Sequence, residues 1–596
     1  MAPTVGTHIL ARLREHGIRR VYGYPGDGIN GILGGFHELG DEIEFIQAAH
    51  EELAAFMACA HAKFSGDVGV CMATSGPGAI HLLNGLYDAK LDHQPVVAIV
   101  GQQKAISLGG NYQQEVDLQT LFKDVASDFV QVAIAAGQVT HLIDRAVQTA
   151  RATRSVTCVI VPSDLQEEEI EEPPRTHGVV YSGGAIRRPH VVPVREELQR
   201  AAEVLNGAER VAVLAGQGAR GAAAQLERLA DVLGCGIAKA LNGRDVLPDD
   251  LPYVTGSIGL LGTKPSDVMM QECDALLMIG SSFPYSEWLP EPGEARGVQI
   301  DVDATRLGIR YPMEVNLAGD AADTLDALLP LLEPKADRAW RERIEREVAD
   351  WWELLADRAR QPADPLNPEL VFHELSAQLP DDCMLTADSG SSTNWWARHL
   401  RFRRGMRGAL SGTLATMGPA VPYALAAKLV HPDRPVVAAE GDGAMQMNGL
   451  NSLIDVAKYA HRWSEPTFVV LVLNNRDLNQ VTWEQRVMAG DAKLDASQVV
   501  PDFPYARYAE LLGFEGIRVD APDQVGPAWD RALAAGRPVV LEAVTDPEVP
   551  PIPPHIEFEQ ARKMASALRR DPARGHMLKA MGRSLTATRL PGRGDG

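Results

Sequence analysis

Three stretches of this chain alternate short apolar runs with helical patterns, and this alternation limits the fold more than any other feature of the sequence. The first stretch contains the runs RRVYGYPG, GVCMATSGPG, QPVVAIVG and VTCVIVPSD, each of which ends in turn residues. Alternation of this kind is typical of parallel β-sheets whose strands are connected by helices. We therefore expect an α/β protein built from doubly wound parallel sheets.

The second stretch carries RVAVLAGQGARG, ALLMIGSSFPY and VQIDVD, and the third carries CMLTADSGSS, RPVVAAEGDG, TFVVLVLNN and RPVVLEAVTD. A chain of 596 residues is too long for a single hydrophobic core. We predict three domains and a basic tail, over residues 1–175, 190–335, 365–555 and 556–596. The acidic stretch 164–178 is expected to be an exposed linker, and the charged stretch 333–362 a helical connector.

Charge and composition exclude several classes of protein. A net charge of -22 disfavours nonspecific binding to nucleic acid, because the averaged field repels phosphates. No run of 18 apolar residues is present, and the six cysteines lack metal or disulfide spacing, so we expect a cytoplasmic protein with reduced thiols. The basic residues after Arg562 leave two interpretations open: a solvated tail, or a segment that contacts a partner or anionic lipid at the inner face of the membrane.

Polar residues follow two apolar runs of the third stretch, in AAEGDGAMQMNGLNSL (438–453) and VVLVLNNRDLNQ (469–480). The carboxyl ends of parallel strands meet at one edge of a sheet, where ligands gather. Glycines beside Asp442 let a phosphate approach the backbone, but the carboxylate would repel it unless a cation lay between them. We predict a Mg²⁺ site formed by Asp442, Asn475 and the carbonyl of Asp477.

The chain resembles, over nearly its whole length, the thiamine-diphosphate enzymes of the pyruvate oxidase and acetolactate synthase group. The resemblance implies a pyrimidine-binding first domain, a central FAD-binding Rossmann-like domain and a diphosphate-binding third domain. Glu51, which follows His50 in IQAAHEELAAFMA, matches the acid that activates the cofactor in this family. The other residues that match the family's thiamine-diphosphate site are Pro25, Gly26, Gly76, Gly78, Gly390, Ser391, Ser392, Met417, Gly441, Gly443 and Ala444.

The central stretch resembles the FAD-binding segments of pyruvate oxidases. LAGQGARG, TGSIGLLG, IGSSFPYSEWLP, QIDVD and AGD occur in the family's order. The resemblance implies that the FAD contacts in these segments are Gly216, Gln217, Gly218, Thr255, Gly280, Ser281, Phe283, Asp301 and Asp320. The segment IPPHIEFEQARK at 552–563 looks like the approach to the tail of the quinone-reducing branch. FAD is therefore expected beside thiamine diphosphate and Mg²⁺.

Two positions depart from the family pattern. Gln113 stands in place of a substrate-facing Phe while Gln114 is retained, and Gln480 stands in place of an aromatic residue while Glu484 is retained. Amides that become buried need hydrogen-bonding partners, so we expect water or a substrate more polar than pyruvate beside Gln113 and Gln480. Gln114, Gln480 and Glu484 are the predicted substrate residues, with Glu484 as the proton carrier.

The resemblance implies oxidative decarboxylation of a 2-oxo acid, pyruvate to acetate, with electrons passing through FAD to a quinone. A carboligase of the acetolactate synthase type, with FAD structural or absent, is the alternative. A scaffold that binds the cofactor without turnover is a third interpretation, which Glu51, Asp442 and Asn475 argue against. In this family the first domain of one subunit faces the third domain of another, so we expect a homotetramer built from dimers.

Overall fold

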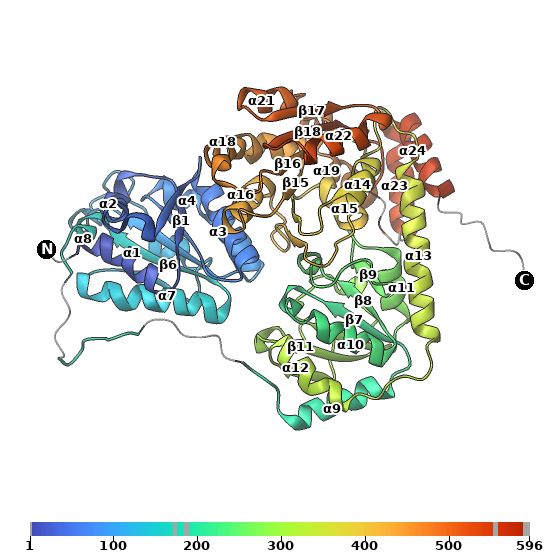
Figure 1. Ribbon diagram of the computed structural model, residues 1–596, viewed down its shortest axis with the longest axis horizontal. Coiled ribbons are helices and arrows are strands. Elements are labelled where there is room, and N and C mark those ends of the chain that lie inside the picture. The colour runs from blue at the N-terminus through green and yellow to red at the C-terminus, as the bar shows by residue number, and fades with distance from the viewer. Residues whose placement is uncertain are drawn as a thin grey trace, which may run out of the picture. The chain divides into compact units, whose positions relative to one another are not determined.

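The computed structural model describes residues 3–170, 176–183, 190–551, 553, 558–571 and 573–587. Its strands form three six-stranded sheets, and each pairing with a defined register is parallel. Helices connect successive strands (Figure 1). The prediction of three parallel α/β sheets is therefore confirmed. In the described part of the chain, no helix combines the length and the apolar character that crossing a membrane requires.

The chain divides into two compact units, and the first contains Met1–Arg188, Ala409–Asp433 and Gln446–Glu465. Its sheet has the order β2-β1-β3-β4-β6-β5. The strands are β1 (Arg20–Gly23), β2 (Glu44–Gln47), β3 (Gly69–Ala73), β4 (Val96–Gln102), β5 (Val130–Val132) and β6 (Val156–Pro162). The helices are α1 (Val5–Glu15), α2 (Asn30–Leu39), α3 (Glu51–Ser65), α4 (Pro77–His81), α5 (Leu83–Leu91), α6 (Leu118–Phe122), α7 (Val139–Thr153), α8 (Ser163–Gln166), α16 (Ala420–Val430) and α18 (Leu450–Tyr459).

Helix α3 is the central helix of this unit. It begins after His50, whose side chain accepts a hydrogen bond from the backbone N–H of Glu52, and it ends at Gly66, whose φ of 77° suits glycine. Most of its residues are buried, because α5 packs on one side of it and α16 on another. A helix covered on several sides is expected to be apolar around its circumference, as AAFMACA is.

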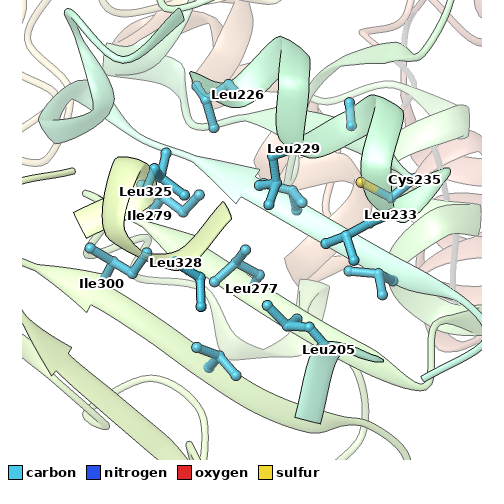
Figure 2. Close-up of a cluster of buried hydrophobic side chains, with 14 of the residues drawn as sticks. Leu205, Leu226, Leu229, Leu233, Cys235, Leu277, Ile279, Ile300, Leu325 and Leu328 are labelled. Carbon is cyan, nitrogen blue, oxygen red and sulfur yellow. The ribbon is translucent and has the colours of Figure 1, made fainter. Parts of the chain in front are cut away.

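The second unit contains the other two sheets, and the central sheet has the order β12-β11-β10-β7-β8-β9. Its strands are β7 (Val211–Ala215), β8 (Gly236–Lys239), β9 (Val254–Ser257), β10 (Ala275–Ile279), β11 (Arg296–Asp301) and β12 (Val315–Ala318). Helices α9 (Arg195–Gly207), α10 (Ala223–Leu233) and α12 (Ala321–Leu328) bury leucines against one face of this sheet (Figure 2). Helices α11 (Lys264–Glu272) and α13 (Ala339–Ala359) cover the other, and α13 lies in the predicted helical connector.

The third sheet has the order β14-β13-β15-β16-β18-β17, which repeats the order of the first sheet. Its strands are β13 (Met384–Ala387), β14 (Arg407–Ala409), β15 (Val436–Gly441), β16 (Phe468–Asn474), β17 (Glu515–Val519) and β18 (Val539–Val544). The accompanying helices are α14 (Pro368–Gln378), α15 (Ser391–His399), α17 (Asp442–Ala444), α19 (Asn479–Glu484), α20 (Asp495–Gln498), α21 (Tyr505–Leu511), α22 (Val525–Leu533), α23 (Phe558–Arg570) and α24 (Arg574–Ala587). The first and third stretches thus share one architecture.

Each sheet has one point at which the chain reverses the direction in which it adds strands. This point lies between β1 and β3, between β7 and β10, and between β13 and β15. Ligands of open parallel sheets bind at such points, outside the carboxyl ends of the strands. Six of the predicted cofactor residues lie at or just after the carboxyl ends of these six strands: Gly26, Gly76, Gly216, Gly280, Gly390 and Gly441.

Two sequence-based expectations are wrong in part. The stretch 164–178 is not an exposed linker at its start, because Gln166 is fully buried and its amide donates to the carbonyls of Gly28 and Val161. The basic tail is not solvated throughout. Met564 in α23 and Met577 in α24 are buried in a cluster with Trp483. Residues 171–175 and 588–596 lie outside the described part of the chain.

Candidate active site

In the first unit, Glu51 lies against the turn that follows β3. Its side chain is nearly buried, and Oε2 lies 3.0 Å from Nδ1 of His81. A Cβ added to Gly78 would lie 3.0 Å from Oε1 of Glu51, so the carboxyl group approaches the backbone at a glycine. His50, Glu51 and His81 are close enough to share a metal ion, although Nδ1 of His50 already accepts from the N–H of Glu52. The predicted acid therefore reaches the switch point of the first sheet.

Gln114 lies against the same turn from another direction. Gly76 has a φ of 60°, and a Cβ added to it would lie 2.8 Å from the Cβ of Gln114. Gln113 and Gln114 are both exposed, so neither amide needs a partner from the protein. Pro25 is exposed at the end of β1, and Gly26 packs against Thr74, which follows β3. The structure thus brings Glu51, Gly76, Gly78 and Gln114 together.

Met417, half-buried, follows a segment that is hydrogen-bonded to helices of the first domain. Asp92 accepts bonds from the N–H groups of Gly412 (2.9 Å) and Thr413 (2.8 Å). The amide of Asn84 on α5 donates to Oγ1 of Thr416 (3.0 Å) and to the carboxylate of Glu52 (2.6 Å). Met417, which is predicted to contact thiamine diphosphate, therefore belongs to the same compact unit as Glu51.

Helix α18 holds the segment that precedes Glu51. The hydroxyl of Tyr459 accepts from the N–H of Gln47 (2.8 Å) and donates to its carbonyl (3.0 Å), and Asp455 accepts from the N–H of Ala49 (2.8 Å). Burial raises the pKa of Asp455 to about 6. Sequence reasoning missed both residues, because no local pattern links them to a segment about 400 residues away.

In the second unit, Asp442 is a buried carboxylate at the switch point of the third sheet. It accepts hydrogen bonds from the backbone N–H groups of Gly443 (2.8 Å) and Arg476. Burial raises its pKa to about 7, and Asp477 adds to this increase. A divalent cation would relieve the cost of this buried charge, so Asp442 fits the predicted Mg²⁺ site.

Two glycines border open space at this switch point. A Cβ added to Gly390, with a φ of 135°, or to Gly441 would meet no other heavy atom of the described residues within 4 Å. Gly390 precedes α15, and Gly441 precedes α17, so backbone N–H groups at both helix starts can meet an anion. The hydroxyl of Ser392 donates to the carbonyl of Asp388 (3.3 Å), whereas Gly390 and Ser391 remain suited to the diphosphate.

Asn475 and Asp477 follow β16 and meet Asp442 through the turn at Arg476, which has a φ of 58°. Oδ1 of Asn475 accepts from the N–H of Asp477 (3.0 Å) and keeps a second lone pair. The Asp477 carboxylate binds Lys493 (2.8 Å), Thr482 and Asn479, and the Asp477 carbonyl accepts from the N–H of Asn479 (2.6 Å). A carbonyl oxygen has a second lone pair that a cation can use, and this contact stays a prediction. Together these donors fit thiamine diphosphate with Mg²⁺.

The predicted substrate residues of α19 form a hydrogen-bonded chain. Oε1 of Gln480 accepts from Nδ2 of Asn394 (2.7 Å), and Nε2 of Gln480 donates to Oε1 of Glu484 (2.9 Å). Asn394 is 1% exposed. The carbonyl oxygen and the NH₂ group of Gln480 therefore both have hydrogen-bond partners within the protein, so Gln480 does not require a polar substrate. Asn394 was missed in the sequence, because its only signal is its position three residues after Ser391.

The predicted FAD residues Gly216, Gln217, Gly218, Gly280 and Ser281 follow the two strands of the central switch point. Thr255 lies in the edge strand β9, Asp301 ends β11 and Asp320 follows the edge strand β12. Several of these residues have roles within the protein. The N–H of Gly216 donates to Ile279 and that of Gly218 to Gly280, and a Cβ on any of these glycines would collide with the opposite backbone. Thr255 is buried, and its hydroxyl lies 2.8 Å from that of Ser266. Asp301 and Asp320 each accept a backbone N–H two residues onward. The glycine pattern is therefore explained by strand packing, and the FAD contacts stay predictions.

Comparison with known proteins places these features in context. Family models described as the N-terminal TPP binding domain, the central domain and the C-terminal TPP binding domain of thiamine pyrophosphate enzymes match residues 3–121, 198–328 and 388–543. The chain is 36% identical over 559 residues to a putative thiamine pyrophosphate-containing protein of Bacillus subtilis, which covers 94% of each chain.

A pyruvate oxidase and an acetolactate synthase are among the relatives with named activities. Pyruvate oxidase of Lactiplantibacillus plantarum is 28% identical over 565 residues, or 94% of this chain and 92% of that protein. The large subunit of acetolactate synthase isozyme 2 of Escherichia coli is 30% identical over 563 residues, or 91% of this chain and 97% of that protein. These two relatives are similar to this chain by nearly the same amount.

Proposed function

Because the chain belongs to the thiamine pyrophosphate enzyme family, we propose that it catalyses the oxidative decarboxylation of a 2-oxo acid, pyruvate to acetate, with electrons passing through FAD to a quinone. The single observation that carries the proposal is the switch point of the third sheet. There a buried carboxylate, an amide oxygen and two glycines beside open space supply what a Mg²⁺-bound diphosphate needs.

Each of the predicted site residues has its own role in this reaction. Thiamine diphosphate supplies the electron sink that permits a 2-oxo acid to lose CO₂. Asp442, Asn475 and the Asp477 carbonyl would hold the metal, and Glu51 would exchange a proton with the cofactor. Glu484, which is exposed at the end of α19, moves protons at the substrate.

The finer parts of the proposal rest on the family. FAD would occupy the central switch point near Asp301 and Asp320, and a quinone would reoxidise it. A homotetramer would complete each site with residues of two subunits. Contact of the basic tail with a membrane belongs to the same proposal, although Met564 and Met577 use part of this tail for packing.

The alternative is a carboligase of the acetolactate synthase type. Two observations favour it: relatives of this kind are as similar to the chain as pyruvate oxidase is, and the central glycines are explained by packing without FAD. In that case carbon–carbon bond formation would follow loss of CO₂, and FAD would be structural or absent.

The visible absorption spectrum of the purified protein separates the two. It is recorded without oxygen, before and after addition of pyruvate with thiamine diphosphate and Mg²⁺. We expect an oxidised flavin band that bleaches with pyruvate. A band that persists while acetolactate accumulates, or no flavin band together with acetolactate, would replace the oxidase by the carboligase.

A further inference from the structure

We propose that Asn394 and Gln480 form a polar relay that orients the carboxylate of Glu484. The proposal rests on the role of Glu484 in the proposed function. It assigns to Asn394, on a different helix from Glu484, a positioning role.

The backbone of α19 is fixed independently of the relay. The amide of Asn479 and the indole N–H of Trp483 both donate to the carbonyl of Pro547, at 2.7 and 3.0 Å, and Oγ1 of Thr482 donates to Asp477 at 2.9 Å. The start and the middle of the helix are therefore held. What remains free to turn is the Glu484 side chain, which is exposed at its end.

Gln480 restricts that freedom. Its Nε2 lies 2.9 Å from Oε1 of Glu484, one turn further along the helix, where side chains four residues apart meet. A hydrogen bond between two flexible side chains at the surface orients little by itself, because both can turn away together. Gln480 cannot turn freely, since its Oε1 is held at 2.7 Å by Asn394, which is 1% exposed. The buried amide thus anchors the exposed carboxylate.

The direction of the relay follows from the charge of Glu484. A carboxylate only accepts hydrogen bonds, so Gln480 must present N–H to it and its carbonyl to Asn394. Asn394 must then donate. If the residue at position 394 could only accept, Gln480 would have to reverse, and its carbonyl oxygen would face the carboxylate of Glu484. An acceptor at position 394 should therefore lower activity more than an apolar side chain does, and loss of packing alone would not have this effect.

The test compares five variants as holoenzymes with thiamine diphosphate and Mg²⁺: Asn394→Leu, Asn394→Asp, Gln480→Leu, the double variant Asn394→Leu/Gln480→Leu, and Gln485→Leu. Gln485→Leu is the matched control. Gln485 follows Glu484 in the sequence, but its side-chain amide is hydrogen-bonded to the amide of Gln498 and not to Glu484. Steady-state kinetics with pyruvate give kcat and KM. Binding of a phosphonate analogue of pyruvate, followed by tryptophan fluorescence, gives a measurement that does not depend on turnover.

We expect Asn394→Leu and Gln480→Leu each to lower kcat by about 10- to 100-fold, because the proton carrier is misplaced. The double variant should be no worse than either single one, and Asn394→Asp should be worse than Asn394→Leu. Affinity for the analogue should change less than threefold, and Gln485→Leu should match the wild type. The double variant also controls for folding, since replacing both partners of a buried hydrogen bond by apolar groups is close to neutral.

Additive losses in the double variant, an Asn394→Asp variant as active as Asn394→Leu, or an equal loss in Gln485→Leu would each overturn the relay. Failure of the proposed function looks different. In that case the wild type itself would release no CO₂ from pyruvate, from longer 2-oxo acids or from aromatic ones.

Discussion

Nζ of Lys63 lies 2.7 Å from Oδ2 of Asp92, and both side chains are buried in the first unit. Burial disfavours the charge of Asp92, yet Lys63 and the N–H groups of Gly412 and Thr413 keep the pKa of Asp92 below its ordinary value. Lys63 also donates to the carbonyl of Leu410. This ion pair therefore fixes the segment that leads to Met417.

Replacing Lys63 by Met should lower the free energy of unfolding by about 3–5 kcal/mol, because it leaves Asp92 charged and buried without its partner. Urea denaturation followed by circular dichroism measures the loss. The control is Arg360→Met, since the ion pair of Arg360 with Asp357 is 67% exposed on each side and should be worth less than about 1 kcal/mol. Equal effects of the two variants would show that the buried pair does not anchor the segment.

Asp455→Asn should make stability depend less on pH. Burial raises the folded-state pKa of Asp455 from 3.8 to about 6, so between these pH values the folded state binds more protons than the unfolded state. Stability from this group is complete below pH 3.8 and is lost as pH rises through 6. The Asn variant keeps an acceptor for Ala49 and should exceed the wild type at pH 7 by on the order of 1–3 kcal/mol. Unfolding of both proteins at pH 4 and pH 7 checks this, and an unchanged difference between them would contradict it.

Asp442→Asn should weaken Mg²⁺-dependent binding of thiamine diphosphate by about 100-fold or more, because the amide lacks the charge that attracts the cation. Calorimetric titration with the cofactor, with and without a chelator, measures the effect. Asp495→Asn changes an exposed carboxylate of the same domain and should bind as the wild type does. Tight binding to the Asp442 variant would remove this residue from the metal site.

Gly78→Ala should lower activity without unfolding the protein. A Cβ at this position would lie 2.8 Å from Cγ2 of Thr74 and 3.0 Å from Oε1 of Glu51, so the carboxyl group must move. A misplacement of about 1 Å can cost about 100-fold in rate, and we expect a smaller loss here because the shift is smaller. Gly34→Ala is the control, because the added Cβ meets nothing within 4 Å on helix α2 and should stabilise the helix by about 0.5–1 kcal/mol. Full activity of Gly78→Ala would show that Glu51 tolerates the shift.

The sequence predicted the inner strands and missed the edges. The apolar runs correspond to β1, β3, β4, β6, β7, β10, β11, β13, β15, β16 and β18. The six edge strands, β2, β5, β9, β12, β14 and β17, are all absent from that set. Most of the edge strands are only partly buried, as Val130–Val132 is, so they lack the continuous apolar run of a strand covered on both faces. The edge strand β9 is buried, but its sequence VTGS contains only one large apolar residue. Inner strand β8 was missed as well, because its sequence GIAK contains only one large apolar residue.

The residues of the candidate site could be predicted where polar side chains directly follow a strand. Asp442 and Asn475 could be found because glycines and amides at strand ends form a local pattern. Asn394, Asp455 and Tyr459 could not, since each acts through side-chain hydrogen bonds to a segment far away in the sequence. The sequence pointed to Gln480 but not to its hydrogen-bond partner Asn394. A polar substrate was therefore expected in the place of a partner that the protein itself supplies.

The most direct test of the account is CO₂ release from pyruvate by the wild type and by Glu51→Gln, each with thiamine diphosphate and Mg²⁺ bound in measured amounts. Glutamine keeps the size of the side chain and a hydrogen bond to His81 but cannot exchange a proton. We predict that the wild type releases CO₂ only with both cofactors, and that Glu51→Gln binds them equally but is slower by about 10²–10⁴-fold. Release of CO₂ by Glu51→Gln at the wild-type rate would contradict the account.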